Sequence, residues 1–190
     1  MTNRDVEPED LARCRAGDPR GLAAVYDVVG DRVYRLCRGV LGNDADAEDA
    51  AQEVLLRVLE KARSFDGRSR FSTWVYRLTV NHALNFRRQR DRRRPASLEA
   101  GLEERHATEP SPADAAARSE AHEALDRLLA ALPDDARAIL SLREVEALSY
   151  REIAAALDVP VGTVMSRLAR ARARLLRAGE KMEIMMESRP

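Results

Sequence analysis

The sequence predicts an all-α protein made of two small helical domains that are joined by a flexible linker. Apolar residues recur at spacings of three and four through most of the 190 residues, which is the period of an amphipathic helix. No clean run alternates apolar with polar residues, as a half-buried strand would. Aromatic residues make up only 4% of the chain, whereas alanine and leucine are plentiful.

The N-terminal domain, assigned to residues 1–95, begins with a short helix over 11–16 and a long helix. Asp18-Pro19 supplies a cap and a first helical position for the long helix, which ends near Gly42. One apolar stripe keeps the helical spacing along its whole length: Leu22, Val25, Tyr26, Val29, Val33, Leu36, Cys37 and Val40. Such a stripe marks the side that faces a core.

The next helix is opened by Asp44 or Asp46, because acids in a first turn favour the positive end of the helix dipole. Its inner face is apolar: Ala47, Ala50, Ala51, Val54, Leu55, Val58 and Leu59. Its outer face holds Asp49, Gln52, Glu53 and Leu56. A leucine among exposed acids is a clue to a partner surface, although single exposed leucines are ordinary.

A loop over 63–70 and an arginine-rich helix complete this domain. We interpret Trp74 as a core residue rather than a stacking platform, because it keeps step with Phe71 and Leu78. Another face of the same helix carries Arg77, Asn81, Asn85, Arg88 and Arg92 and ends in the cluster over 87–94. Amides and guanidinium groups in register match a nucleic-acid surface better than a solvated face, which would include acids.

Charge is distributed unevenly, although the formal net charge is zero. Residues 61–94 contain eleven basic residues and two acids, whereas residues 44–53 contain five acids and no base. This polarity suggests separate basic and acidic partners. Residues 95–117 hold three prolines and five acids against Arg105 alone, which predicts an acidic linker, assigned to 96–117.

The C-terminal domain, assigned to residues 118–178, is expected to contain four helices and to end in a helix-turn-helix. Helices over 118–132 and from Pro133 precede that motif. Ser149 and Glu152 have the form of a capping box, and Asp158-Val159-Pro160 interrupts the helical pattern. We interpret residues 179–190 as a frayed tail, with a helical extension or a partner contact as alternatives.

The second helix of this motif has one apolar side, formed by Val164, Leu168, Ala171 and Leu175. The other side carries Thr163, Ser166, Arg170, Arg174 and Arg177. Small polar groups near the N-terminus suit base edges in a major groove, and arginines suit guanine or phosphate. From 160 to 178 there are five arginines and no acid. For this segment alone, a solvated helical hairpin remains the alternative.

Several kinds of site are not expected. Cys14 and Cys37 have no companion at metal-ligand spacing, so a reduced core thiol is favoured for Cys37, and the scattered histidines define no zinc site. We find no phosphate-binding glycine loop and no nucleophile with a placed base, so we expect no catalysis, cofactor or small-molecule substrate. No apolar run suits a membrane span or signal peptide, which predicts a cytoplasmic protein.

Two groups of motifs follow one another along the chain. The first contains Asp46-Ala-Glu-Asp-Ala-Ala-Gln-Glu53, Ser64-Phe65, Phe71-Ser-Thr-Trp74, Asn81 and Arg87-Arg88. The second contains Leu132-Pro133, Leu148-Ser-Tyr-Arg-Glu-Ile-Ala154, Gly162-Thr-Val-Met-Ser-Arg-Leu168 and Arg170-Ala-Arg172. They resemble region 2 and region 4 of the bacterial extracytoplasmic-function (ECF, group 4) RNA polymerase sigma factors, in the order of that family.

The resemblance implies a role in transcription initiation for each charged face. Asp49, Gln52, Glu53 and Leu56 would dock on the β′ clamp helices of core RNA polymerase, and region 4 on the β flap. The loop would hold a flipped base of the −10 element in a pocket formed by Phe65, Asp66, Gly67, Arg68 and Ser69. The next helix would add −10 contacts from Arg77, Asn81, Asn85 and Arg88. Duplex −35 DNA would be read by Thr163, Ser166, Arg167, Arg170 and Arg174.

The resemblance also implies an anti-sigma factor that inhibits the protein. If that anti-sigma factor is bound to the inner membrane, it would hold the protein at the membrane. Two positions on or beside the DNA-reading face depart from the family, since many relatives carry Arg or Lys at Met165 and a bulky side chain at Ala169. The preferred promoter is therefore expected to differ from the family's commoner sequence. The alternative is a conventional helix-turn-helix regulator, which would need neither the acidic face nor the base-capture loop.

Overall fold

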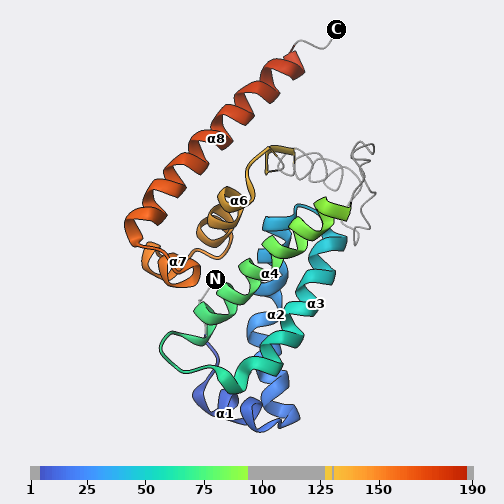
Figure 1. Cartoon of the computed structure of the whole chain (residues 1–190), viewed down its shortest axis with the longest axis vertical. Coiled ribbons are helices and arrows are strands. Elements are labelled where there is room, and N and C mark those ends of the chain that lie inside the picture. Colours follow the sequence, from blue (N-terminus) through green and yellow to red (C-terminus); the bar gives the residue numbers. More distant parts are fainter. Residues whose placement is uncertain (1–4, 94–126, 130, 188–190) are drawn as a thin grey trace, which may run out of the picture.

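The computed structural model describes residues 5–93, 127–129 and 131–187, and every regular element in these ranges is helical. The N-terminal domain contains α1 (Pro8–Ala16), α2 (Pro19–Leu41), α3 (Asp44–Lys61), the 3₁₀ turn η1 (Ala62–Ser64) and α4 (Phe71–Arg93) (Figure 1). The C-terminal domain contains α6 (Asp134–Leu140), the π-helical turn η2 (Ser141–Val145), α7 (Tyr150–Leu157) and α8 (Val161–Glu187). The prediction of two helical domains is confirmed. The predicted linker and most of the predicted helix over 118–132 lie outside the described residues.

Single residues set the helix ends in the N-terminal domain. α1 stops at Gly17 (φ 81°) and α2 at Gly42 (φ 85°), in a left-handed conformation that glycine adopts without steric cost. The Asp18 side chain caps α2 by accepting a hydrogen bond from the N–H of Arg20, as the sequence predicts. α3 begins at Asp44, but its cap is Asn43, whose side chain accepts from the N–H of the residue three positions on.

The core of this domain is aliphatic along most of its length and aromatic at one end. The stripe on α2 packs against the inner face of α3, with Val25, Leu36 and Val54 fully buried. Tyr26, predicted to belong to this stripe, is instead 56% exposed. Burial of each such side chain stabilises the fold by roughly 1.5–3 kcal/mol. At the aromatic end, the rings of Phe71 and Trp74 lie 5.3 Å apart, so Trp74 packs with the core as expected.

The helix-turn-helix forms as the sequence predicts. The Ser149 hydroxyl accepts from the N–H of Glu152, whose carboxylate accepts from the N–H of Ser149 at 2.8 Å, which completes the capping box. α7 ends at Asp158 in a left-handed conformation (φ 54°), and α8 follows Pro160 directly. The helix before this motif changes to a π-helical turn over Ser141–Val145, in which Leu142 is buried and Val145 is 45% exposed.

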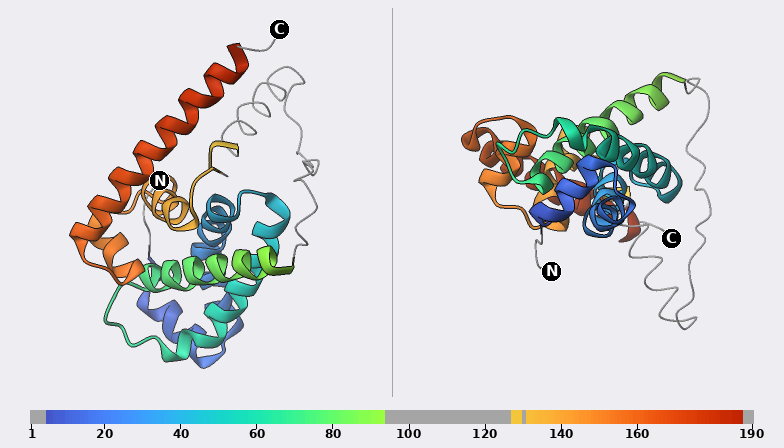
Figure 2. Two further views of the ribbon diagram at one scale, coloured as in Figure 1. Left: turned by 45° about the horizontal axis from the view of Figure 1, so that its top comes forward. Right: turned by 90° about the horizontal axis from the view of Figure 1, so that it is seen from below.

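α8 is longer than predicted. The interpretation of residues 179–190 as a frayed tail is wrong for most of that segment, since one helix of 27 residues runs from Val161 to Glu187. Gly179 costs only about 1 kcal/mol in a helix interior, and the residues after it are mostly good helix formers. At 1.5 Å per residue α8 is about 40 Å long, and it extends beyond the other described helices (Figures 1 and 2). None of the described helices is both long and apolar enough to cross a membrane.

The two domains pack against each other, which the sequence did not indicate. α7 contacts α4, whereas α6 and η2 contact α2 (Figure 2). The buried side chains of both domains form one continuous hydrophobic cluster. Asp134, at the start of α6, pairs with Arg87 of α4 at 2.9 Å and with the fully buried Arg137 at 3.0 Å. The positions of α4 and α8, the two helices predicted to contact DNA, are therefore fixed relative to one another in this structure.

Candidate polymerase-binding and nucleic-acid interfaces

The predicted docking face on α3 is exposed to solvent. Asp49, Gln52, Glu53 and Leu56 all lie on the surface, and Leu56 is 61% exposed. The opposite side of α3 is anchored in the core by Ala50, Val54 and Val58. Helical periodicity therefore holds three polar groups around one exposed leucine on a rigid helix. This arrangement suits a protein partner whose surface has an apolar patch surrounded by basic side chains.

His82, which the sequence did not single out, connects α4 to this face. Its side chain is buried, Nδ1 lies 2.6 Å from Nη1 of Arg57, and Nε2 lies 3.4 Å from the carboxylate of Glu53. Burial first, and then the Arg57 charge, lower the pKa of His82, so the ring is neutral at physiological pH. Nδ1 then accepts from Arg57, and the ring proton is on Nε2, facing Glu53. No pattern in the sequence marks this contact, because it joins two helices.

The predicted base-capture loop has a fixed base and an exposed tip. Phe65 is 7% exposed and packs against Phe71 and Trp74, with ring centroids 5.3 and 5.6 Å apart. Arg15 stacks on Phe65 and donates hydrogen bonds to the carbonyl oxygens of Ala62 and Phe65. Phe65 therefore anchors the loop and is not accessible to a base in this structure, contrary to the expectation that it lines the pocket.

The tip of the loop consists of Asp66, Gly67, Arg68 and Ser69. Asp66 accepts from the N–H of Arg68 at 3.1 Å, and Gly67 adopts φ 74°, which makes a tight turn. The Arg68 side chain is 89% exposed. Arg68 also pairs with the Asp66 carboxylate at 3.3 Å, so these residues present a backbone turn and an exposed ion pair to solvent.

The predicted −10 face on α4 is only partly open. Asn81, Asn85 and Arg88 are exposed, and Arg88 lies 3.4 Å from the amide oxygen of Asn85. Arg77 is half-buried and donates from Nη2 to the carbonyl oxygen of Ala155 in α7 at 3.0 Å. One of the four side chains predicted to bind DNA is thus engaged by the C-terminal domain.

Two other arginines in the basic cluster are structural. Arg87 pairs with Asp134 at 2.9 Å, and Arg90 pairs with Asp46. Their side chains are only 17% and 33% exposed. The interpretation of the whole cluster over 87–94 as a nucleic-acid surface is therefore too broad, because some of its charge is neutralised by internal acids.

The outer face of α8 is exposed over the length predicted to read DNA. Ser166, Arg170 and Arg174 are exposed, whereas Thr163 and Arg167 are half-buried beside the core residues Val164 and Leu168. The Ser166 hydroxyl donates to the carbonyl of Thr163 at 3.0 Å, and Arg170 Nε donates to the carbonyl of Ser166 at 3.2 Å. These are bonds within one helix, so base edges or phosphates can replace them on binding.

This outer face has two different flanks. The arginines lie along one flank, and Val161, Met165 and Ala169 lie along the other at a spacing of four residues. Met165 is 55% exposed and Val161 38% exposed. The small residues Gly162, Ser166 and Ala173 lie between the two flanks, so the helix backbone can approach a groove closely. Arg172 lies beside the apolar flank, where Glu144 of η2 binds it at 2.7 Å.

Comparison with known families matches both domains. The family model for Sigma-70 region 2 matches residues 25–93, and that for Sigma-70 region 4 matches residues 122–175. The helix bundle with its acidic face, followed by an arginine-bearing helix-turn-helix, is therefore that of a sigma-70-type protein.

Similarity to curated relatives narrows this class. The chain is 33% identical over 171 residues to the ECF RNA polymerase sigma factor SigW of Bacillus subtilis (strain 168), covering 85% of this chain and 90% of that protein. It is also 33% identical over 179 residues to the RNA polymerase sigma-H factor of Pseudomonas aeruginosa, covering 90% and 93%. The chain belongs to the ECF RNA polymerase sigma factors. Its function is that of an alternative sigma factor, which directs promoter-specific transcription.

Two solved structures share the fold. CnrH, solved in complex with the cytosolic domain of CnrY, superimposes with a TM-score of 0.69 at 21% identity, covering 93% of this chain and 99% of that chain. The sigma factor RpoE of Bartonella quintana, solved with the anti-sigma factor NepR, has a TM-score of 0.62 at 22% identity, covering 82% and 94%.

Proposed function

We propose that this chain is a group 4 sigma factor in which three exposed faces divide the work of initiation. Region 2, over residues 1–95, binds core polymerase through α3 and the −10 element through the loop and α4. Region 4, over residues 118–178, reads the −35 duplex through α8. The observation that carries this division is the separation of charge, since the exposed acids of α3 and the exposed arginines of α8 lie on different domains.

The α3 face is proposed to dock on the β′ clamp helices. Leu56 supplies the apolar contact, while Asp49, Gln52 and Glu53 supply acceptors for basic residues of the partner. A conventional helix-turn-helix regulator would have no use for this face. The face is therefore the feature that distinguishes a polymerase subunit from such a regulator.

The −10 element is proposed to meet the loop tip and the open part of the α4 face. The residues accessible in this structure are Asp66, Gly67, Arg68 and Ser69 on the loop, and Asn81, Asn85 and Arg88 on α4. Extruding a base costs a few kcal/mol, which contacts to the base and the backbone must offset. Phe65 contributes by holding the loop in place rather than by touching the base.

The −35 element is proposed to lie against α8. Thr163 and Ser166 lie near the N-terminus of the helix, where side chains reach base edges in a helix-turn-helix complex. Arg167, Arg170 and Arg174 add guanine or phosphate contacts, and region 4 also contacts the β flap. No step of this scheme needs a metal, a cofactor or a catalytic residue.

An anti-sigma factor is the proposed regulatory partner, and the proposed location is the cytoplasm. CnrH and the Bartonella RpoE protein share this fold and were solved with the cytosolic domain of CnrY and with NepR. A membrane-bound anti-sigma factor would hold this protein at the inner membrane.

The test is transcription with purified core polymerase, with Leu56→Ala as the key variant. The matched control is Tyr26→Ala, because Tyr26 is a large side chain of similar exposure (56%) on a different helix, α2. Leu56→Ala should weaken binding to core polymerase and reduce transcripts, while the control leaves both unchanged. Wild-type protein that gives no promoter-specific transcript with core polymerase would favour the conventional regulator.

A further inference from the structure

Both ends of the base-capture loop are held by residues from the start of the chain. The loop leaves η1 at Phe65 and joins α4 after Arg70, and its tip over 66–69 lies between these two ends. The residues that hold the ends belong to the N-terminal segment (residues 5–17), which contains α1. This segment lies outside residues 25–93, which the Sigma-70 region 2 model matches.

Arg15 of α1 holds the first end of the loop. Its guanidinium lies 5.6 Å from the centroid of the Phe65 ring, a cation–π contact. Nε donates to the carbonyl oxygen of Ala62 at 3.2 Å, and Nη2 donates to the carbonyl oxygen of Phe65. Arg63 in turn donates from Nε to the carbonyl oxygen of Arg15 at 2.8 Å. Because a guanidinium is planar and rigid, its two bonds fix the direction in which the loop leaves η1.

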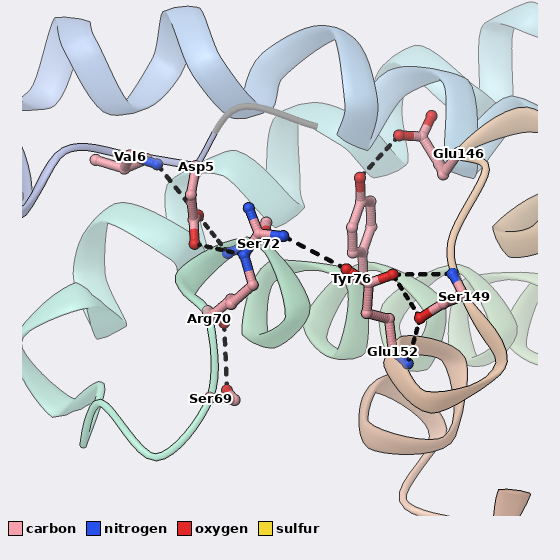
Figure 3. A network of polar contacts seen from close by, with 9 residues as sticks. All are labelled: Asp5, Val6, Ser69, Arg70, Ser72, Tyr76, Glu146, Ser149 and Glu152. Carbon is pink, nitrogen blue, oxygen red and sulfur yellow. Dashed lines mark hydrogen bonds and ion pairs between the residues drawn. The ribbon is translucent and has the colours of Figure 1, made fainter. Parts of the chain in front are cut away.

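Asp5 holds the second end of the loop. Its carboxylate accepts from the N–H of Ser72 at 3.0 Å and pairs with Arg70 at 3.3 Å (Figure 3). Ser72 is the second residue of α4, so Asp5 caps this helix from a distant part of the chain. Its charge also favours the positive end of the α4 dipole. Because Arg70 pairs with Glu152 as well, at 3.4 Å, the Ser72 bond is the contact that depends most on Asp5.

The N-terminal segment is itself anchored in the core. Val6, Leu11 and Cys14 are buried, and α1 packs against α2. The contacts of the loop tip run within the loop, from Asp66 to Arg68 and from Ser69 to the next carbonyl. Such contacts shape the tip but do not fix its position on the domain. That position follows from the two ends, and therefore from Arg15 and Asp5.

We propose that Arg15 and Asp5 are positioning residues for −10 recognition, which hold the loop tip ready for a flipped base without touching DNA themselves. This inference rests on the proposed capture of a base by the loop. A loop that is held at both ends loses less conformational freedom on binding. If loss of one contact leaves the tip competent for only about a tenth of the time, the apparent affinity falls about tenfold.

The test measures how much affinity for single-stranded −10 DNA comes from one base. Holoenzyme made from core RNA polymerase and the full-length chain is titrated with a fluorescent single strand that wild-type holoenzyme selects from a random pool. The same strand with an abasic nucleotide at each position in turn identifies the captured base, whose removal should weaken wild-type binding about tenfold or more. Arg15→Ala and Asp5→Ala should bind the intact strand about tenfold more weakly than wild type, and the abasic strand equally well.

The matched controls are Arg13→Ala and Asp10→Ala, because these two side chains also lie on α1 but pair with each other at 3.4 Å. Both controls should keep the wild-type ratio of the two affinities. Misfolded protein lowers both affinities alike, so it leaves this ratio unchanged. Asp5→Asn keeps an oxygen that can accept from Ser72 and should retain most of the wild-type ratio.

The two affinities also separate positioning from a purely structural role. An equal loss on the intact and the abasic strand would overturn the role of the residue replaced, because the defect would then not act through the base. Wild-type affinity that no abasic nucleotide lowers would overturn base capture by the loop, and this inference with it. Failure of the wider proposed function appears differently, as the absence of promoter-specific transcription by wild type.

Discussion

Replacing Tyr76 with phenylalanine removes one hydrogen bond from the contact between the domains and little else. The Tyr76 side chain is 3% exposed, and phenylalanine keeps the ring and its packing. What is lost is the hydroxyl that donates to Glu146 at 2.9 Å. The same environment raises the pKa of Tyr76 well above its usual value, through burial first and then the Glu146 charge. The hydroxyl is therefore protonated and available as a donor throughout the physiological range.

The expected loss is about 1.5–2 kcal/mol. Hydrogen bonds to charged groups contribute roughly 1.5–3 kcal/mol, and the loss is greatest where water cannot replace the donor. Glu146 is too buried for water to reach, which favours a large effect. It also keeps two contacts to Arg35 at 3.0 and 3.4 Å, which places the loss at the lower end of the range.

The assay is urea unfolding followed by circular dichroism and by the fluorescence of Trp74, the only tryptophan. Tyr34→Phe is the matched control, because the Tyr34 hydroxyl donates at 3.2 Å to Asp44, whose side chain is 47% exposed. Water can replace that donor, so the control should lose about 0.5 kcal/mol or less. Equal losses for the two variants would refute the argument that burial of Glu146 makes its hydrogen bond strong.

Three further predictions concern α8 and the core. Replacing a thymine of a selected −35 duplex by uracil should weaken wild-type binding by about 0.8 kcal/mol in an anisotropy titration, because Met165 loses its contact with the thymine methyl group. The affinity of Met165→Ala should not change with this replacement. An equal loss for both proteins would contradict the proposal that the apolar flank of α8 contacts thymine. Arg170→Ala should cost roughly 1–3 kcal/mol of binding free energy on that duplex and less on one of scrambled sequence, because Arg170 is placed to contact bases. Arg177→Ala should weaken binding to both duplexes alike and lower the salt dependence of the affinity by about one charge, because Arg177 is placed to contact phosphate. Identical behaviour of the two variants in a salt series would refute this difference between base and phosphate contacts. Burial raises the pKa of Cys37 to about 12, so above the ordinary thiol pKa of 9.0 only the unfolded state releases the proton. Above pH 9.0, the unfolding free energy of wild type should therefore fall by about 1.4 kcal/mol per pH unit relative to that of Cys37→Ala. Parallel plots of unfolding free energy against pH for the two proteins would contradict this.

Much of the secondary structure could be predicted because its signals are local. The Asp18 cap, the glycine that ends α2 and the Ser149–Glu152 capping box each act within a few residues. The stripes on α2 and α3 follow from helical periodicity, and they place the acidic residues proposed to dock on polymerase on the solvent side. Motif order was enough to recognise the family, because each motif is a run of neighbouring residues.

Other features depended on pairings between distant residues. The position of an arginine on α4 does not by itself show whether its side chain is exposed or pairs with an internal acid, since the neighbours Arg87 and Arg88 differ in this respect. Arg87 meets Asp134 and Arg90 meets Asp46, whereas Arg88 stays exposed. Likewise, Phe65 shares a loop with exposed residues but is buried by packing against Phe71 and Trp74.

The sequence by itself determined the helices, their capping residues and the charge of each face, since these follow from interactions within a few residues along one helix. Only the tertiary structure decided how the two domains meet and which polar groups take part in that contact. Glu146 and Arg35 are 111 residues apart in the chain, and Gly39 meets Ser141 only because α2 and η2 pack face to face. Contacts of this kind depend on the shape and desolvation of both surfaces together, and neither surface alone contains that information.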